Sequence, residues 1–165
     1  MSNRRLVAGF GLVGFSLTLV TNAHGQLLSH KDLSLVSALT IATTAAELCK
    51  TQGYTVSVTV VGRNGEIIVQ LRGDYAPPHT IENSFRKAYS ARTFRVPSGE
   101  LVKRVKDNPT APFVFLQNVV AAQGALPIKV GEDTIGAVGV SGAPGGEKDE
   151  VCAKAGIDKA ADGLK

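Results

Sequence analysis

The sequence lacks most of the patterns by which enzymes and metalloproteins are recognised. It contains no HExxH or CxxC motif, and no arrangement of serine, histidine and aspartate typical of a nucleophilic triad. No connection is long enough to be the crossover of a Rossmann unit. Nothing in the spacing therefore indicates nucleophilic catalysis, structural zinc or a dinucleotide-binding fold.

Only one long apolar run is present, and it lies at the start of the chain. Arg4 and Arg5 precede an apolar stretch over residues 6–20, and a small-x-small triplet follows at residues 23–25. This is the layout of a secretory signal peptide, and about 15 residues is short for a membrane span. We therefore expect residues 1–25 to be removed, and the mature protein to be periplasmic or secreted, with no membrane span. A retained anchor is the alternative.

The charge is too evenly balanced to indicate a nucleic-acid partner. The chain has 18 Lys and Arg against 14 Asp and Glu, a net charge of +4. Removing Arg4 and Arg5 leaves 16 basic residues against 14 acidic ones, or +2. Nucleic-acid-binding domains carry a concentrated basic stripe, so no nucleic acid is expected among the partners.

Cysteine is scarce, and the two present are Cys49 and Cys152. An oxidising compartment permits a bridge between them. Closing a loop of about 100 residues would stabilise the fold by on the order of 4 kcal/mol in the chain-entropy model. Two buried thiols in helices that never meet are the alternative.

The first part of the mature chain has the apolar spacing of a long helix. Small and apolar residues recur at helical intervals between Leu35 and Cys49. Ser29 is a suitable N-cap, and Gly53 follows as a C-cap should. We predict a helix over about residues 30–51.

A β-hairpin follows, because residues 54–61 alternate in polarity and Asn64-Gly65 is a strong turn signal. Placing that dipeptide at the turn pairs Arg63 with Glu66, Val60 with Val69 and Val58 with Leu71, so the apolar faces coincide. The opposite face pairs Thr59 with Gln70 and Ser57 with Arg72. Since that face is polar, we expect it to meet water, a ligand or another subunit.

The remaining segments complete an α-β-β-α-α-β-β-α order. Thr80 and Ser98 are the expected caps of helices ending near residues 95 and 106. Residues 113–123 are ambiguous: residues 113–116 fit a strand, and residues 119–123 fit either a strand or a helix. A second hairpin is expected over 125–130 and 134–141, and a final helix over 147–164. Gly136 and Gly139 are costly inside a strand unless another backbone packs close. We predict one α+β domain over residues 26–165, with a central antiparallel sheet of about five strands flanked by helices.

Several blocks of this chain resemble the GlcG/HbpS family of small haem-binding proteins. The likeness covers about residues 28–157. It is carried by the first helix and by the blocks SVTVVGRNGEIIVQLRGDYAPPHT, FRKAYSA and ALPIKVGEDTIGAVGVSGAPGGEKDEVCAKAG, in that order. The resemblance implies an α+β domain that forms homo-oligomers and binds haem or a corrinoid. The chain resembles most the exported haem-binding branch of the family. Members of that branch are associated with iron or redox sensing at the cell envelope.

The chain departs from that family at three places. Tyr75 stands where the family often has a small residue, Ser90 where it has threonine, and Gly124-Ala125 where it has two glycines. The bulk of Tyr75 would close a pocket or stack on a ligand.

A haem site needs an apolar slot, donors for two propionates and usually an axial ligand. His79 is the first candidate for the iron, because a neutral imidazole suits it and two prolines fix its approach. A solvated histidine is the alternative, and the same choice applies to His30. Ser90 is the second candidate, unless its hydroxyl bonds back to its own helical turn.

The other candidate residues surround these two. Arg72, Arg86 and Lys87 would hold propionates, or else form a solvated charged face. Thr80 and Tyr75 complete the cofactor-binding set, and Asp74 and Glu82 would bind free iron or pair with the arginines. The glycine-rich loop 142–146 would offer backbone N–H groups to an anion, although an ordinary strand-to-helix turn is favoured.

Three functions follow, and the sequence does not separate them. The first is an exported, oligomeric protein that sequesters or senses haem or iron and meets an envelope sensor or transporter. The second is an enzyme acting on haem or a small organic acid by general acid–base chemistry. The third is a non-catalytic assembly module.

Overall fold

The computed structural model describes residues 25–165, so the expected leader lies almost wholly outside the described residues. Among the residues that are described, no helix is long and apolar enough to cross a membrane.

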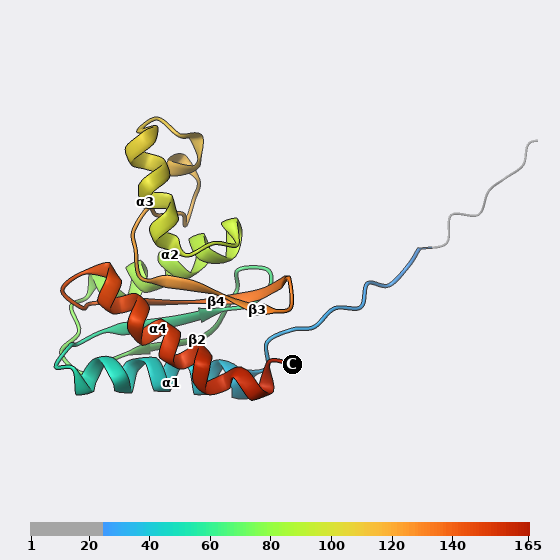
Figure 1. Cartoon of the computed structure of the whole chain (residues 1–165), viewed down its shortest axis with the longest axis horizontal. Coiled ribbons are helices and arrows are strands. Elements are labelled where there is room, and N and C mark those ends of the chain that lie inside the picture. Colours follow the sequence, from blue (N-terminus) through green and yellow to red (C-terminus); the bar gives the residue numbers. More distant parts are fainter. Residues whose placement is uncertain (1–24) are drawn as a thin grey trace, which may run out of the picture.

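A single four-stranded antiparallel sheet carries helices on both faces (Figure 1). The strands lie in the order β2-β1-β4-β3. In chain order the elements are α1 (Leu35–Thr51), β1 (Ser57–Val61), β2 (Ile67–Arg72), α2 (His79–Phe94), α3 (Ser98–Asp107), β3 (Ala125–Val130), β4 (Asp133–Ser141) and α4 (Gly146–Ala160). The α+β class is confirmed, but the expected count of about five strands is too high by one.

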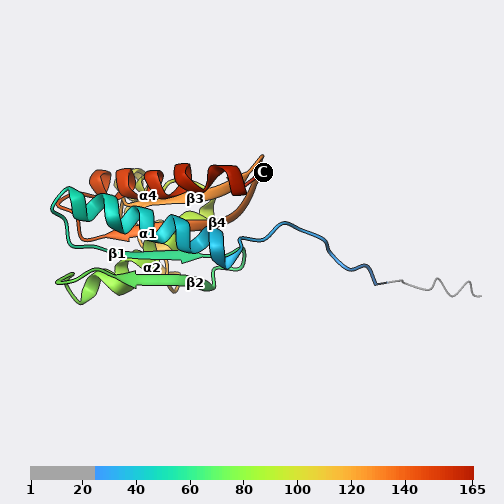
Figure 2. The ribbon, with the colours of Figure 1, turned by 90° about the horizontal axis from the view of Figure 1, so that it is seen from below.

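Helices α1 and α4 cover one face of the sheet and α2 covers the other (Figures 1 and 2). Successive residues of β1 and β4 point alternately to the two faces, as a strand period of two requires. Val58, Val60, Val138 and Val140 form a core with the small residues of α1 and α4. A smaller core under α2 consists of Val61, Ala88, Ala91, Ala125 and Ala137.

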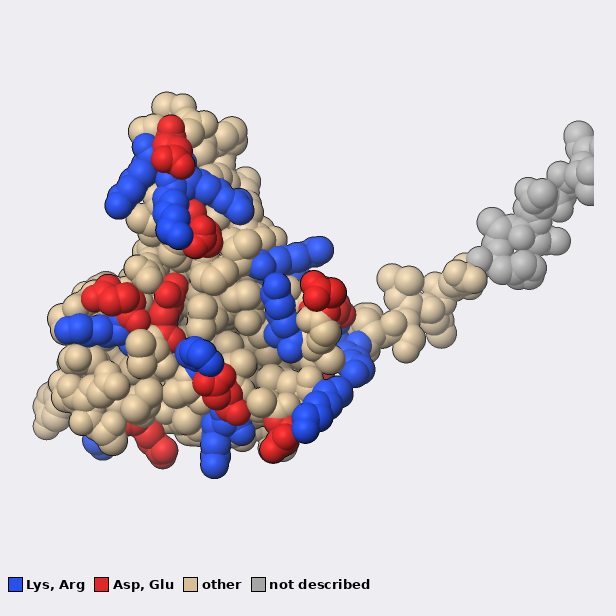
Figure 3. Space-filling model, in the orientation of Figure 1, with Lys and Arg blue, Asp and Glu red and all other residues tan. Residues whose placement is uncertain are grey.

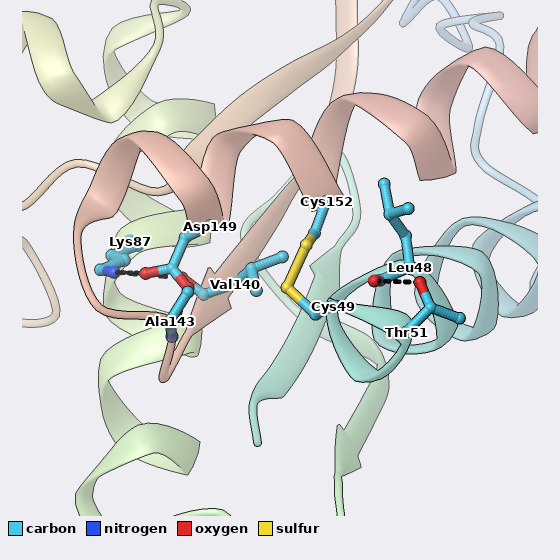
Figure 4. Close-up of a disulfide and its surroundings, with 8 residues drawn as sticks. All are labelled: Leu48, Cys49, Thr51, Lys87, Val140, Ala143, Asp149 and Cys152. Carbon is cyan, nitrogen blue, oxygen red and sulfur yellow. Dashed lines mark hydrogen bonds and ion pairs between the residues drawn. A yellow bond between two sulfur atoms is a disulfide. The ribbon is translucent and has the colours of Figure 1, made fainter. Parts of the chain in front are cut away.

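The disulfide between Cys49 and Cys152 joins α1 to α4 and confirms the bridge considered from the sequence (Figure 4). The two Cα atoms are 5.7 Å apart and 103 residues apart in sequence. Both side chains are fully buried. The bridge therefore fixes the two helices against each other beneath the sheet.

The register of the first hairpin is confirmed for four of its pairs. Val60 lies opposite Val69, Val58 opposite Leu71, Thr59 opposite Gln70 and Ser57 opposite Arg72. Beyond Val60 the ladder is irregular and Val61 pairs with Ile67, so the expected pairing of Arg63 with Glu66 is wrong. Arg63 instead hydrogen-bonds Asp133 at the tip of the second hairpin.

Helix α2 covers the β1 half of this polar face, while Arg72 at the end of β2 remains exposed. Ser57 and Thr59 are fully buried. The Ser57 hydroxyl lies 2.8 Å from that of Thr80, and the Thr59 hydroxyl lies 2.7 Å from that of Ser84. The expectation of a face open to water, a ligand or another subunit is therefore wrong for Ser57 and Thr59, whose hydroxyls pair with those of a helix.

The glycines of β4 mark close backbone contacts, as expected. A Cβ at Gly139 would lie 2.7 Å from the backbone nitrogen of Ala88 and would also clash with the carbonyl oxygen of Ser84. A Cβ at Gly136 would lie 2.5 Å from the carbonyl oxygen of Val61. Helix α2 thus rests on the sheet through backbone as well as side chains.

Three helix starts differ from the sequence prediction. α1 begins at Leu35 rather than near residue 30, because Ser34 provides the cap by accepting the backbone N–H of Ser37. α2 begins at His79, so Thr80 lies inside the helix and does not cap it. Ser98 is the first residue of α3, and its hydroxyl accepts the backbone N–H of Ala125.

Helix α3 and the 3-10 turn Pro112–Phe115 project from the body on the α2 side, and we call residues 98–116 the arm (Figure 1). The expected strand at residues 113–116 is not formed. Pro112 opens a 3-10 turn there, and Phe113 packs edge-on against Phe94 with ring centroids 5.4 Å apart. The final helix also ends earlier, at Ala160, and a 3-10 turn follows it.

Candidate functional site

A hollow of about 500 Å³ lies between α2 and the start of α4, below the base of the arm. α2 forms one wall. The end of β4 and the loop into α4 form the opposite wall, and Val102, Ala122 and Gln123 close one end. The hollow therefore lies where four segments that are distant in sequence converge.

Three residues of α2 line this hollow at four-residue intervals: His79, Asn83 and Lys87. Residues four apart lie on the same face of a helix. His79 is exposed, Asn83 is half-buried and Lys87 is only 4% exposed. The hollow thus deepens along α2, from an imidazole at its mouth to an ammonium at its floor.

At the floor, Lys87 forms a buried ion pair with Asp149 of α4 (Figure 4). The Lys87 Nζ donates to Asp149 Oδ2 at 2.8 Å and to the Val140 carbonyl oxygen at 3.1 Å. The backbone N–H of Ala143 donates to Asp149 Oδ1 at 3.0 Å. The pair therefore joins α2, β4 and the first turn of α4.

Burial raises the pKa of Asp149 above its ordinary value, and the charge and hydrogen bond of Lys87 oppose that shift. The carboxylate also lies in the first turn of α4, where the helix dipole favours a negative charge.

Gly124 provides the space that this pair needs. A Cβ there would lie 2.7 Å from the Lys87 Nζ and 2.8 Å from the Val140 carbonyl oxygen, and its φ of +131° favours glycine. Of the two residues compared with the family's Gly-Gly, the one retained as glycine is therefore the one that the ion pair requires.

The wall opposite α2 is polar. The Asn83 side-chain amide donates to the hydroxyl of Ser141 at 2.9 Å, across the hollow from α2 to the end of β4. The Gln123 amide donates to Glu150 at 2.9 Å. These bonds hold the polar lining in place without closing the hollow.

His79, the first candidate ligand, lies at the mouth of the hollow with its side chain exposed. That side chain forms no hydrogen bond or ion pair with any other described residue. A second, smaller hollow borders it on the far side, lined by His79, Glu82, Asn83 and Arg86. The imidazole thus lies on a ridge between two depressions.

Arg86 lies beside that ridge and is partly committed. Its Nη2 donates to the Val119 carbonyl oxygen at 2.9 Å, and its Nη1 lies 3.7 Å from Glu82. Its side chain is 38% exposed. Arg86 therefore anchors the segment after the arm while it still presents charge at the surface.

The structure gives Ser90 and Thr80 packing roles. The Ser90 hydroxyl donates to the Arg86 carbonyl oxygen and accepts the backbone N–H of Val120 at 2.8 Å. It is fully buried and lines neither hollow, so the expected contact with iron is not supported. Thr80 borders the hollow, but its hydroxyl is bonded to Ser57 and to Pro77.

Arg72 and Tyr75 lie elsewhere. They line a separate depression of about 410 Å³, formed with the end of α1 and residues 73–74. The Arg72 guanidinium is bound to the Ala76 carbonyl oxygen at 2.6 and 3.0 Å. Tyr75 is 94% exposed and has a positive φ of 62°. The seven candidate residues therefore do not form one site.

The remaining candidates are solvated or structural. His30 lies 3.1 Å from Asp32, is 43% exposed and lines neither of these hollows. Asp74 lies in the depression with Arg72 and Tyr75. No group of three or more His, Cys, Asp and Glu side chains suited to a metal ion occurs among residues 25–165.

Sequence reasoning missed Asp149 and Ser141. Asp149 is three residues before Cys152 on the inner side of α4, but nothing local shows that it pairs with a lysine 62 positions earlier. The glycine-rich loop 142–146 was the available signal, and it does form a wall of the hollow.

Comparisons with known proteins agree on the family. The family model described as "Haem degrading protein HbpS-like" matches residues 33–158. The crystal structure of HbpS is 36% identical, with a TM-score of 0.77, and the match covers 84% of this chain and 97% of that one. A double mutant of Streptomyces reticuli HbpS is 34% identical, with a TM-score of 0.77, and the match covers 87% of this chain and 97% of that one.

A complex of PduOC with haem is also similar, at 25% identity and a TM-score of 0.70, with 78% of this chain and 95% of that chain covered. Comparison with curated proteins found no match. The extent of the family match and the identity to HbpS together show that this chain belongs to the HbpS-like family of haem-degrading proteins.

Proposed function

We propose that this protein binds haem on the surface around His79, with the imidazole as the iron ligand. The observation that carries the proposal is a histidine free of other described partners, at the mouth of a hollow of about 500 Å³. Neutral imidazole nitrogen is a common haem ligand. The membership in a haem-degrading family and the similarity to a haem complex support the choice of cofactor.

The residues around His79 fit the other needs of a haem. Pro77, Val102, Ala122 and Ala143 provide apolar contact for the ring. Arg86 on one side and Lys87 on the other are cations within the two depressions that His79 borders. Bound haem would supply a redox-active iron, and the chain would supply its orientation.

We further propose that the protein is exported and works as a homo-oligomer. The disulfide supports an oxidising compartment. The hollow opens to solvent, so one chain covers one face of a porphyrin, and a second copy would cover the other. In this proposal the assembly sequesters or senses haem at the envelope, where a sensor or transporter receives the signal or the haem.

A haemin titration tests the central claim. Mature protein should give a saturable Soret shift at micromolar haemin, and His79→Ala should weaken binding by at least about tenfold, or 1.4 kcal/mol. His30→Ala is the matched control, since it removes the other histidine of the described chain. Equal affinity in both variants would exclude His79 as the ligand. A corrinoid and ferric iron, titrated in parallel, test the alternative ligands.

The family description favours a second candidate, the degradation of bound haem. Haem-loaded protein mixed with ascorbate in air should lose its Soret band faster than free haemin does, with release of iron. If the band of the bound haem persists as long as or longer than that of free haemin, the protein protects its haem, and sequestration is the better description.

Location and assembly have direct tests. N-terminal sequencing of the exported protein should show a start near Gln26, and light scattering of the mature form should give a multiple of the chain mass. A start at Met1 or a monomer would contradict the corresponding part of the proposal.

A further inference from the structure

The floor of the hollow keeps hydrogen-bond donors that the protein itself does not use. An ammonium group has three N–H donors. Lys87 donates one N–H to Asp149 and one to the Val140 carbonyl oxygen, so its third N–H has no acceptor among the described residues. Lys87 is 4% exposed, and it lines the hollow.

Ser141 is in a similar position. It is 3% exposed, lines the hollow and accepts the side-chain N–H of Asn83. Its own hydroxyl hydrogen has no acceptor among the residues that the structure describes. A hydroxyl rotates to suit its partner, so this donor is available to a ligand.

At the floor, each oxygen of the Asp149 carboxylate already accepts one hydrogen bond from the protein. Asp149 accepts from Lys87 through one oxygen and from the Ala143 N–H through the other. Its charge is balanced by Lys87 and by the N-terminal turn of α4. The capacity left at the floor is therefore mainly donor capacity, and it includes a cation.

We propose that the floor of the hollow is a carboxylate-binding subsite, in which Lys87 and Ser141 donate to the carboxylate of a ligand. Charge-assisted hydrogen bonds to a carboxylate are stronger than neutral ones, and more so where water is excluded. Higher in the hollow, the side-chain amide oxygens of Asn83 and Gln123 accept no hydrogen bond from the described residues. They are therefore available to accept one from a ligand hydroxyl or N–H.

Two molecules offer this chemistry: a haem propionate and a free small organic acid. The first rests on the proposed function. His79 and Lys87 are eight residues apart on α2, about 12 Å along the helix axis, which is of the same order as the reach from the iron to a propionate. The second needs no haem, because the small acid would occupy the floor alone.

The variant Lys87→Met with Asp149→Asn tests the subsite without leaving a buried charge unpaired. Its matched control is Lys103→Met with Glu100→Gln, which makes the same kind of change in an exposed ion pair of α3. Circular dichroism reports whether each variant folds. Ser141→Ala, which removes a single hydroxyl, carries the test if the double variant does not fold.

Calorimetry with succinate and haem-free protein forms the first arm. Haemin compared with haemin dimethyl ester, by Soret titration, forms the second. Succinate binding that the variant weakens at least tenfold and the control leaves unchanged identifies a free acid. Haemin binding weakened at least tenfold, with ester binding unchanged, identifies a propionate.

The proposal is overturned if the hollow variant matches the control for both succinate and haemin. These outcomes are separate from those of the His79 test. A protein whose haem affinity ignores His79 can still bind succinate through Lys87, and the reverse result is equally distinct.

Discussion

The two faces of the sheet pack against their helices through different kinds of contact. Under α1 and α4 the contacts are aliphatic, and a disulfide joins the two helices. Under α2 the apolar core is small, and hydroxyl pairs and a buried ion pair carry many of the contacts. The hollow lies between α2 and the start of α4, so the helix with the weaker apolar packing forms one wall of the candidate site.

The reason for the difference lies in the distance between helix and sheet. Helix α2 touches β4 at Gly139 through its own backbone. At such close range large side chains do not fit, so alanines, serines and threonines fill the space. Buried polar groups must be paired, and the hydroxyls of Ser57, Thr59, Thr80 and Ser84 all have partners.

The largest expected effect is on the aliphatic face. Replacing both cysteines, Cys49→Ala with Cys152→Ala, should lower the free energy of unfolding by on the order of 4–5 kcal/mol, because the bridge closes a loop of about 100 residues. Urea denaturation measures the change. Wild-type protein reduced under denaturing conditions and then refolded is the control. A loss below about 1 kcal/mol would show that the aliphatic core alone holds this face.

A smaller loss is expected where α2 meets the sheet. In Gly139→Ala the added methyl lies against the backbone of Ser84 and Ala88, which cannot move aside as a side chain does. Overpacking of this kind costs roughly 1–3 kcal/mol, again measured by urea denaturation. Gly163→Ala is the matched control, because its methyl would meet only the Ser37 hydroxyl at 3.6 Å. An unchanged stability in Gly139→Ala would mean that α2 has room to withdraw.

The features that the sequence predicted well depend on local pattern. The Asn-Gly turn and the alternation of valines set the hairpin register. The glycines of β4 indicated close backbone contacts, but not that Gly136 would meet β1 and Gly139 would meet α2. The helix starts were missed by one to five residues, because Ser34 rather than Ser29 caps α1, and because α2 and α3 begin directly after Pro78 and Pro97 without a side-chain cap.

The site was less predictable, because its contacts are long-range. The polar stripe of β1 indicated a partner, but a hydroxyl on α2 and a ligand give the same pattern in sequence. Arg72 and His79 are seven residues apart, yet a turn directs them into different depressions. Lys87 was identified as a cation of the site, but its partner is 62 residues later.

The hydroxyl pair under α2 provides a more selective probe. Thr59→Val or Ser84→Ala alone should each cost roughly 1–2 kcal/mol, since each leaves a buried partner short of a hydrogen bond. The double variant should cost less than the sum of the two, because neither hydroxyl is then left behind. Additive losses would show that the 2.7 Å contact contributes little.

The smallest effect separates two ion pairs by pH. Hydrogen bonding to Arg63 lowers the pKa of Asp133 in the folded protein below the ordinary value of 3.8. The ionised Asp133 therefore stabilises the fold above pH 3.8, and this stabilisation is lost as the pH falls through the folded-state pKa. Burial raises the pKa of Asp149 in the folded protein above the ordinary value of 3.8. The resulting stabilisation of the fold is therefore present below pH 3.8, and it is lost as the pH rises through the folded-state pKa.

Unfolding free energies between about pH 3 and pH 7 measure both contributions. The difference between wild type and Asp133→Asn should grow as the pH rises toward about 4. The difference between wild type and Asp149→Asn should shrink as the pH rises above about 4. Slopes of the same sign would show that Lys87 outweighs burial.

The face of the molecule drawn in Figure 3 shows no large patch of one charge. Lys and Arg alternate with Asp and Glu over the face in Figure 3, including the arm. The Lys87–Asp149 pair differs from pairs such as Lys103–Glu100 in being buried.

The contact between α2 and β4 at Gly139 also limits how the hollow can change shape when a ligand binds. Because its backbone rests directly on β4 at Gly139, α2 cannot move closer to the sheet when a molecule enters. The opposite wall, residues 142–146, is held to α4 by the Ala143–Asp149 hydrogen bond, and we expect adjustment to ligands of different size to occur mainly there. We therefore expect a relative that binds a bulkier ligand to differ from this chain in the loop of residues 142–146 rather than along α2.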